Sequence, residues 1–198
     1  MTESWKADGA HPVAQSVHDL GSALWFGGAV MGVAGVNKSG ADLSQGIDRI
    51  RVANSAWSRF GPVEWAGILA AVLTGSRLTA ADAPRIAAQK GMGSLSAAKT
   101  AAIALGIAST AWATYTGGKV GKVAEEVARR GDDVAVKDAS VPTAQTPPEL
   151  AKWQGRQRVA QYLVPVFAGA NIAFSSYLSQ SFRPSATAKG FLGRLLPA

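Results

Sequence analysis

Few side chains in this sequence have the types and spacing that chemistry requires. The chain has 198 residues, two histidines and no cysteine. The lack of cysteine excludes a disulfide scaffold, thiolate zinc sites, iron–sulfur clusters and cysteine nucleophiles. The signature patterns of serine hydrolases, P-loop nucleotide-binding proteins, HExxH metalloproteases and dinucleotide-binding folds do not occur in it. We therefore expect a protein that is not an enzyme and uses no cofactor.

The two histidines, His11 and His18, lie seven residues apart, a spacing that puts both on one face of a helix. Together with Asp8 or Asp19 they could hold a metal ion weakly, but the sequence supplies no secure third ligand. Both also precede the long apolar segments described below. Those segments contain no histidine that could bind a buried haem, so we expect no metal site and no haem.

Three further polar residues lie within or beside long uncharged stretches: Asp19, Glu64 and Asn171. An ionisable group at membrane depth is costly unless it is paired or has a function. Glu64 is expected to form a structural ion pair with an arginine on its side of the membrane (Arg59, Arg156 or Arg158), and a proton- or ion-linked role is the alternative. Asp19 has the same two interpretations at the opposite side, near Arg77, Lys99 and Arg183. Asn171 is expected to make an interhelical hydrogen bond of about 1 kcal/mol.

The uncharged stretches themselves predict the fold. Residues 20–37, 100–118 and 159–182 contain no Asp, Glu, Lys or Arg, and residues 62–78 are apolar except for Glu64 and Arg77. About 17–25 apolar residues suffice for a helix to cross a bilayer. The sequence therefore predicts an all-α, integral membrane four-helix bundle forming a single domain over residues 1–198, with spans at 19–37, 62–78, 100–117 and 159–181. A soluble, alanine-rich bundle is the alternative, but such helices should carry charges along one face.

The ends of the predicted spans carry helix-terminating residues. Pro62 is expected in the first turn of the second helix, and Gly117 and Gly118 at the end of the third. Residues Val120–Arg130 repeat apolar and charged residues at helical spacing and should continue the third helix outside the bilayer. The rest of the third loop, residues 131–153, should be an exposed connector. Residues 189–198 could form a short surface helix.

The distribution of positive charge predicts how the chain is oriented in the membrane. Of the 20 Lys and Arg residues, 12 fall in the first and third loops. The positive-inside rule then places these loops in the cytoplasm and both termini outside, in the plasma membrane. The net charge of +7 is expected to contact anionic lipid headgroups rather than nucleic acid, because no basic run is interleaved with aromatic residues.

Small residues recur at four-residue intervals in the predicted spans. In lipid, such residues let helix backbones approach closely. They predict either packing within the chain's own bundle or contacts with another subunit or a second copy. The residues concerned are Gly28, Gly32, Gly67, Ala71, Gly75 and Gly106.

These features favour a non-catalytic accessory or assembly subunit of a larger membrane complex, with an oligomeric transporter or channel for a small solute or ion as the alternative. The bias toward Ala, Gly, Val and Arg is typical of a high-GC bacterium. In span number and composition the whole chain resembles small four-span membrane proteins of actinobacteria. That resemblance involves no diagnostic motif, so it assigns no role to any residue.

Overall fold

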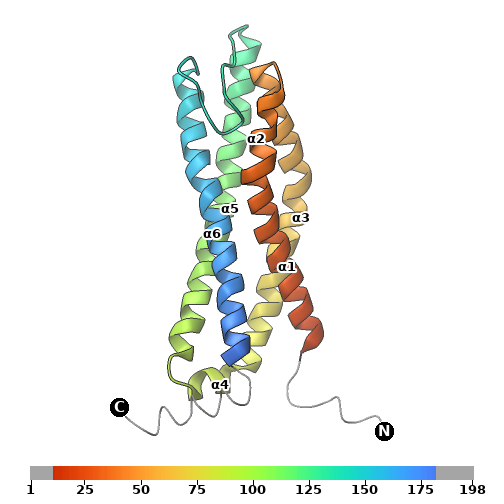
Figure 1. Ribbon diagram of the computed structural model, residues 1–198, viewed down its shortest axis with the longest axis vertical. Helices are drawn as coiled ribbons and strands as arrows, with labels where there is room; N and C mark the ends of the chain where they lie inside the picture. The colour runs from red at the N-terminus through yellow and green to blue at the C-terminus, as the bar shows by residue number, and fades with distance from the viewer. Residues whose placement is uncertain (1–10, 182–198) are drawn as a thin grey trace.

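The computed structural model describes residues 11–181, and the regular elements in that range are all helices. Four long helices run side by side along the molecule (Figure 1). They are α1 (Pro12–Met31), α3 (Gly46–Ala81), α5 (Met92–Arg129) and α6 (Pro148–Ser181). The all-α prediction is confirmed. The surface helix suggested for residues 189–198 lies outside the described residues.

Short elements join the long helices at the two ends. Helix α4 (Ala83–Ala88) links α3 to α5 at what we call the α4 end. At the other end, which we call the head end, α1 continues through a π-helical segment η1 (Gly32–Val36), α2 (Asn37–Ser39) and the 3-10 turn η2 (Gly40–Asp42). The connector between α5 and α6 also lies at the head end (Figure 1). The most extensive packing is between α1 and α3 and between α5 and α6, so the bundle consists of two helix pairs.

The helices extend beyond the uncharged stretches. With 36 residues α3 is roughly 54 Å long at 1.5 Å per residue, well over the ~30 Å of a hydrocarbon core. The expected terminators are therefore wrong: Pro62 lies inside α3, and Gly117 and Gly118 lie inside α5. The amphipathic sequence on the far side of each residue continues the helix. The predicted continuation over Val120–Arg130 is confirmed, since α5 ends at Arg129.

The parts of the helices beyond the uncharged stretches, residues 38–59 and 118–158, form a head with its own core. The buried residues of that core come from α3, α5, α6 and the connector: Ile50, Val120, Val123, Ala124, Val127, Val134, Val136 and Leu150. On the surface of the head, Arg51 Nε donates to Glu125 Oε1 at 2.7 Å and holds the pKa of Glu125 below its usual range. Both side chains are about half exposed, so the pair contributes little to stability.

The connector was expected to be exposed, and this is wrong for much of its length. Val134 and Val136 are 3% and 2% exposed and belong to the head core. Arg49 Nη1 donates to the Val136 carbonyl at 2.6 Å, which fixes the connector to α3. Residues 148–153 are not connector at all, because α6 begins at Pro148. Val134 and Val136 occupy alternate positions, a pattern typical of an extended segment with one buried face. The polar and proline-rich composition of the connector obscured this pattern.

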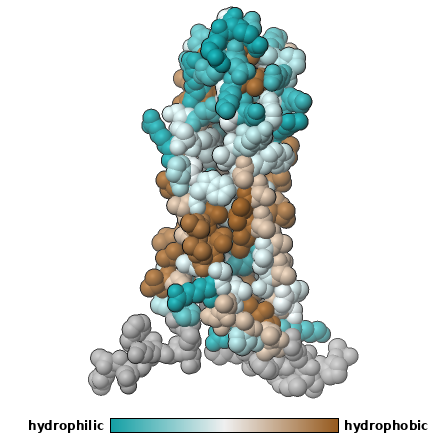
Figure 2. Space-filling view, turned by 180° about the vertical axis from the view of Figure 1, so that it is seen from behind, coloured by the Kyte–Doolittle hydropathy of each residue, from teal (hydrophilic) through white to brown (hydrophobic). Residues whose placement is uncertain are grey.

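Below the head the surface becomes apolar. Figure 2 shows a hydrophilic head end and a hydrophobic band across the middle of the bundle. We call this part the belt, and it corresponds to the predicted spans at 19–37, 62–78, 100–117 and 159–181. Its buried apolar cluster is small: Trp25, Ala29, Ile68, Val164 and Ala168.

Two helical stretches, Pro12–Asp42 and Pro148–Ser181, are long and apolar enough to cross a membrane. Core helices of soluble proteins can pass the same test, but they are mostly buried, whereas only 28% of each of these apolar windows is buried. Neither α3 nor α5 is among the candidates. The structure therefore gives weak support for membrane association and leaves the four-span arrangement as a proposal.

Glycines hold α1 and α3 together at close range. A Cβ at Gly21 would lie 2.5 Å from the Gly67 carbonyl oxygen and 3.0 Å from the Ala71 amide nitrogen, both backbone atoms. Gly75 packs against the His18 ring in the same interface. Gly27 lies on the same helix, but a Cβ there would have no atom within 4 Å.

This difference predicts opposite effects of one substitution at two sites of α1. Gly21→Ala should destabilise the bundle by about 1–3 kcal/mol, because backbone atoms of α3 would have to move. Gly27→Ala should stabilise it by about 0.5–1 kcal/mol through helix propensity. Thermal unfolding of the two purified variants measures both effects. Equal melting temperatures would contradict the close contact.

Candidate functional site

A cavity of about 440 Å³ lies between the two helix pairs, where the belt meets the head. Its walls come from all four long helices and from η1. Seventeen residues line it: Ala29, Val33, Asn54, Trp57, Ser58, Gly61, Pro62, Glu64, Trp65, Thr110, Ala113, Thr114, Gly117, Gly118, Gln157, Gln161 and Val164. This volume falls within the range of ligand-binding pockets.

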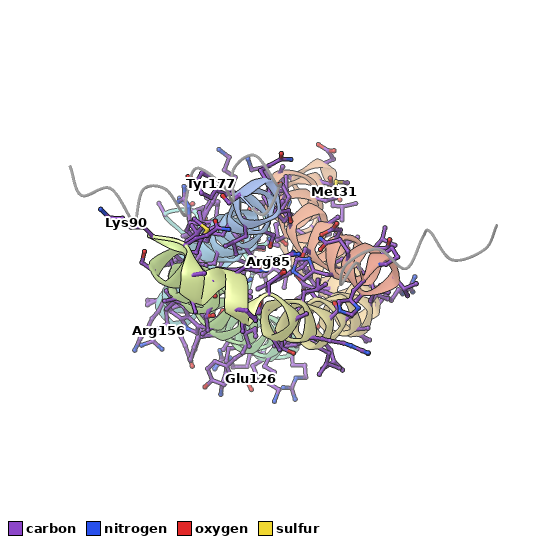
Figure 3. The ribbon with its side chains drawn as sticks, turned by 90° about the horizontal axis from the view of Figure 1, so that it is seen from below. Met31, Arg85, Lys90, Glu126, Arg156 and Tyr177 are labelled. Atoms are coloured by element: carbon purple, nitrogen blue, oxygen red, sulfur yellow. The ribbon has the colours of Figure 1, made fainter. Side chains whose placement is uncertain are left out.

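Glu64 is the one ionisable residue in this lining. It is only 5% exposed, and among the described residues it makes no hydrogen bond and no ion pair. The expected structural ion pair with Arg59, Arg156 or Arg158 is therefore absent from the described structure. All three arginines are exposed. Arg156 projects away from the bundle axis (Figure 3) and lies over the Trp153 ring at 4.7 Å.

A network of side-chain hydrogen bonds closes the head side of the cavity. Asn37 Nδ2 donates to Gln161 Oε1 at 2.6 Å, and Trp57 Nε1 donates to Asn37 Oδ1 at 2.9 Å. Thr116 donates to Gln157 Oε1. These bonds tie α2 to α3 and α6, and α5 to α6. The elements around the cavity are thereby joined to one another at its head side.

The other side of the cavity is closed by packing. Trp25 is 1% exposed, and its Nε1 donates to Thr110 Oγ1 at 3.0 Å, which bridges α1 and α5. The Trp25 ring also fills the space beside Gly106. Ile68, Val164 and Ala168 complete this layer. The cavity therefore does not continue through the belt toward the α4 end.

The hydroxyl groups of Ser58, Thr110 and Thr114 in the lining each already donate a hydrogen bond. Ser58 donates to the Ser55 carbonyl, Thr110 to Gly106 and Thr114 to Thr110, each within its own helix. Their oxygen atoms remain able to accept a hydrogen bond.

Two prolines leave further hydrogen-bond acceptors near the cavity. Pro62 and Pro165 lie inside α3 and α6 and have no N–H, so the carbonyls four residues earlier lose their usual helical donor. Those carbonyls belong to Ser58 and Gln161, and both residues line the cavity. The site thus offers acceptors from hydroxyls and carbonyls, and donors from the amide groups of Gln157 and Gln161, whose Oε1 atoms already accept hydrogen bonds.

The remaining predicted residues lie elsewhere in the bundle. Asn171 is 1% exposed and donates to Ser22 Oγ at 3.1 Å, so the predicted interhelical hydrogen bond is present. Asp19 lies at the α4 end, where it accepts hydrogen bonds from Gln15 Nε2 at 2.8 Å and from His18 Nδ1 at 3.0 Å. Neither residue lies in the cavity lining.

The small residues have a clear structural role. Gly28 faces the Phe60 ring, Gly32 the Trp57 ring and Gly106 the Trp25 ring. Gly67 and Gly75 contact Leu24 and His18 of α1. Ala71 lies against Gly21 and is 3% exposed. Each is therefore used inside the chain's own bundle, which is the packing alternative of the sequence analysis.

His18 forms a second polar spot at the α4 end, beside a cavity of about 40 Å³ that Lys99 also lines. Its Nδ1 is 3.0 Å from Asp19 Oδ1, and its buried Nε2 has no hydrogen-bond partner. Among the described residues, no group of three His, Asp or Glu side chains could hold a metal ion. This spot holds at most a water molecule or two.

Sequence reasoning missed most of the cavity. Asn37, Trp57, Gln157 and Gln161 fall at the borders of the uncharged stretches and read as ordinary polar and aromatic ends. Only Glu64 was singled out as a candidate site residue, and the signal was a carboxyl group inside an otherwise apolar run. Within the lining, the hydroxyl groups of Ser58, Thr110 and Thr114 donate to backbone carbonyls and not to Glu64.

Comparisons of the chain with known protein families, with curated proteins and with solved structures find no match.

Proposed function

We propose that this chain is a four-span integral membrane protein that binds a small molecule inside its bundle and does not transform it. The observation that carries the binding role is the 440 Å³ cavity with the buried, unpaired Glu64 in its wall. A buried carboxyl group without a partner is costly, and such a group is retained where it meets a ligand.

The membrane placement is supported by an inverted distribution of side chains in the belt. Large apolar residues face outward from all four helices, for example Leu20, Leu69, Leu105 and Val166, which are 50–72% exposed. The buried positions of the belt instead include polar residues: Ser22, Glu64, Ser109, Thr110, Thr116, Asn171 and Ser175. A soluble bundle would hold the large apolar residues inside. Exposed large apolar residues also occur in the belt of α3, at Val63, Leu69 and Leu73, and of α5, at Leu105.

Exposed aromatic residues support a boundary at the level of the cavity. Trp112, Tyr115 and Tyr162 are 39–57% exposed and lie near the head end of the belt. Such side chains prefer the headgroup region of a bilayer. The first and third loops form the head and carry most of the positive charge, so the proposed orientation places the head in the cytoplasm and the cavity just inside the cytoplasmic face of the plasma membrane.

A second candidate is an accessory subunit of a larger membrane complex. It is favoured by the head, which projects beyond the belt and offers a charged surface for a partner. The oligomeric transporter or channel is less well supported. The glycine faces that would join copies are used internally, and the Trp25 layer closes the path through the chain.

Two substitutions on α3 test the membrane placement. Leu69 and Val52 are both exposed, at 58% and 46%, but Leu69 lies in the belt and Val52 in the head. Leu69→Arg should impair insertion, because a central arginine costs about 2.5–3.5 kcal/mol, whereas Val52→Arg should not. The fraction of each variant that resists alkaline extraction from membranes is the measurement. Equal fractions would contradict a spanning α3.

The binding role is tested by narrowing the cavity. Gly61 lines the cavity and has open space at its Cβ position, so Gly61→Leu should fold and occupy part of the volume. Native mass spectrometry of protein released from its own membranes in mild detergent should show a bound small molecule. The variant should lose this adduct, whereas the control Gly27→Leu, outside the cavity, should keep it. An adduct that is absent from the parent protein, or unchanged in Gly61→Leu, would contradict the proposal.

A further inference from the structure

We propose that the ligand of this cavity is a protonated amine on a small apolar body, with its ammonium group on the Glu64 carboxylate. This inference rests on the proposed binding function and adds the chemical class of the ligand.

The first argument is charge. No Lys, Arg or His lines the cavity, and Glu64 has no cationic partner among the described residues. An anion entering the cavity would meet a carboxyl group with nothing to offset it. A neutral molecule would supply no counter-charge, so the buried group would bear the desolvation cost of its charge or take up a proton. An ammonium group supplies both the opposite charge and up to three hydrogen-bond donors.

The second argument is the hydrogen-bond inventory. The lining hydroxyls of Ser58, Thr110 and Thr114 donate to their own helices. The indole N–H of Trp57 is bound to Asn37. The wall offers acceptors in Glu64 and in the carbonyls of Ser58 and Gln161 that the two prolines release, and donors in the amide groups of Gln157 and Gln161. An ammonium group can therefore donate to Glu64 and to one or more of these acceptors.

The third argument is the apolar part of the wall. Ala29, Val33, Ala113 and Val164 line the cavity together with the indole rings of Trp57 and Trp65. Indole rings attract cations as well as apolar groups. The walls therefore suit a body of aliphatic or aromatic carbon attached to the amine. A bare metal ion does not fit, because a single carboxylate would be its only charged ligand.

Access comes from the boundary of the belt. Ser58, Pro62, Thr114 and Gly118 line the cavity and are also exposed, so it opens between α3 and α5. Trp112 and Tyr115, on α5, lie at the same level. Amphipathic amines concentrate at this depth of a bilayer, with the charge among the headgroups and the carbon body in the hydrocarbon.

Three probes with one carbon skeleton test the class of ligand. They are 4-phenylbutylamine, 4-phenylbutanol and 4-phenylbutyrate, which carry a positive, a neutral and a negative head. Titration calorimetry on the detergent-solubilised full chain at pH 7.4 should show the amine binding at least about tenfold more tightly than the other two, which corresponds to ~1.4 kcal/mol. Equal affinities, or no binding of the amine, would overturn the proposal.

Glu64→Gln should lower the affinity for the amine to that of the alcohol and leave the alcohol unaffected. This variant should fold, because it removes a buried charge that has no partner in the chain. Glu126→Gln is the matched control, since Glu126 is exposed on α5 and points away from the bundle (Figure 3). It should bind the amine as the parent does. Amine binding that survives Glu64→Gln, or is lost equally in the control, would overturn the assignment.

The amine could belong to a free solute or to a lipid headgroup, and competition separates the two. Phosphatidylethanolamine has a primary ammonium, whereas phosphatidylcholine has no N–H. Competition by the former alone identifies a lipid headgroup, and competition by neither identifies a free amine. Equal competition by both would show occupancy by acyl chains and contradict the proposal. If Gly61→Leu abolishes the binding of all three phenyl probes but they bind equally to the parent, the binding function stands and the amine assignment fails.

Discussion

The close approach of α1 and α3 through Gly21 and Gly67 is the interaction on which the rest of the bundle depends. The backbones meet so closely that not even a methyl group fits between them. Large side chains of the belt must therefore point outward, and the interior is filled by small and polar residues and by Trp25. Such an interior is held by backbone contact and by hydrogen bonds such as Asn171 to Ser22 rather than by a broad apolar core. Close backbone contact through small residues is typical of helices that associate in lipid, which agrees with the proposed membrane placement.

The same constraint accounts for the cavity. Because α1 packs most extensively on α3 and α5 on α6, the space between the two pairs must be filled by side chains. Trp25 fills it in the middle of the belt, and the apolar cluster of the head fills it at the top. Between these two layers the facing residues include three glycines, two threonines and Glu64, and they leave the gap unfilled. A polar network anchored on Asn37 keeps this gap from collapsing.

The number and order of the long helices could be predicted from the sequence, because three stretches lack charge and a fourth carries only Glu64 and Arg77. Their lengths could not, since Pro62 and Gly117 are typical helix ends but are tolerated inside long packed helices. The burial of Val134 in the connector could not be predicted either, because residues that share its core, such as Ile50, lie far from it in the sequence. At the site, Glu64 stood out as a lone carboxyl group in an apolar run. Its lack of a partner could not be predicted, because that depends on which way the exposed arginines, such as Arg156, point in the folded chain.

The measurement that tests the proposed four-span bundle most directly is the labelling of single cysteines in native membranes. The chain contains no cysteine, so each introduced thiol reports on its own position. Leu69→Cys and Leu105→Cys place exposed thiols in the belt of α3 and α5, and Val52→Cys places one in the head. The account predicts that a water-soluble maleimide labels the head thiol in opened membranes and leaves both belt thiols unlabelled until the membranes are dissolved and the protein is denatured. Belt thiols that react as fast as the head thiol would contradict a four-span bundle.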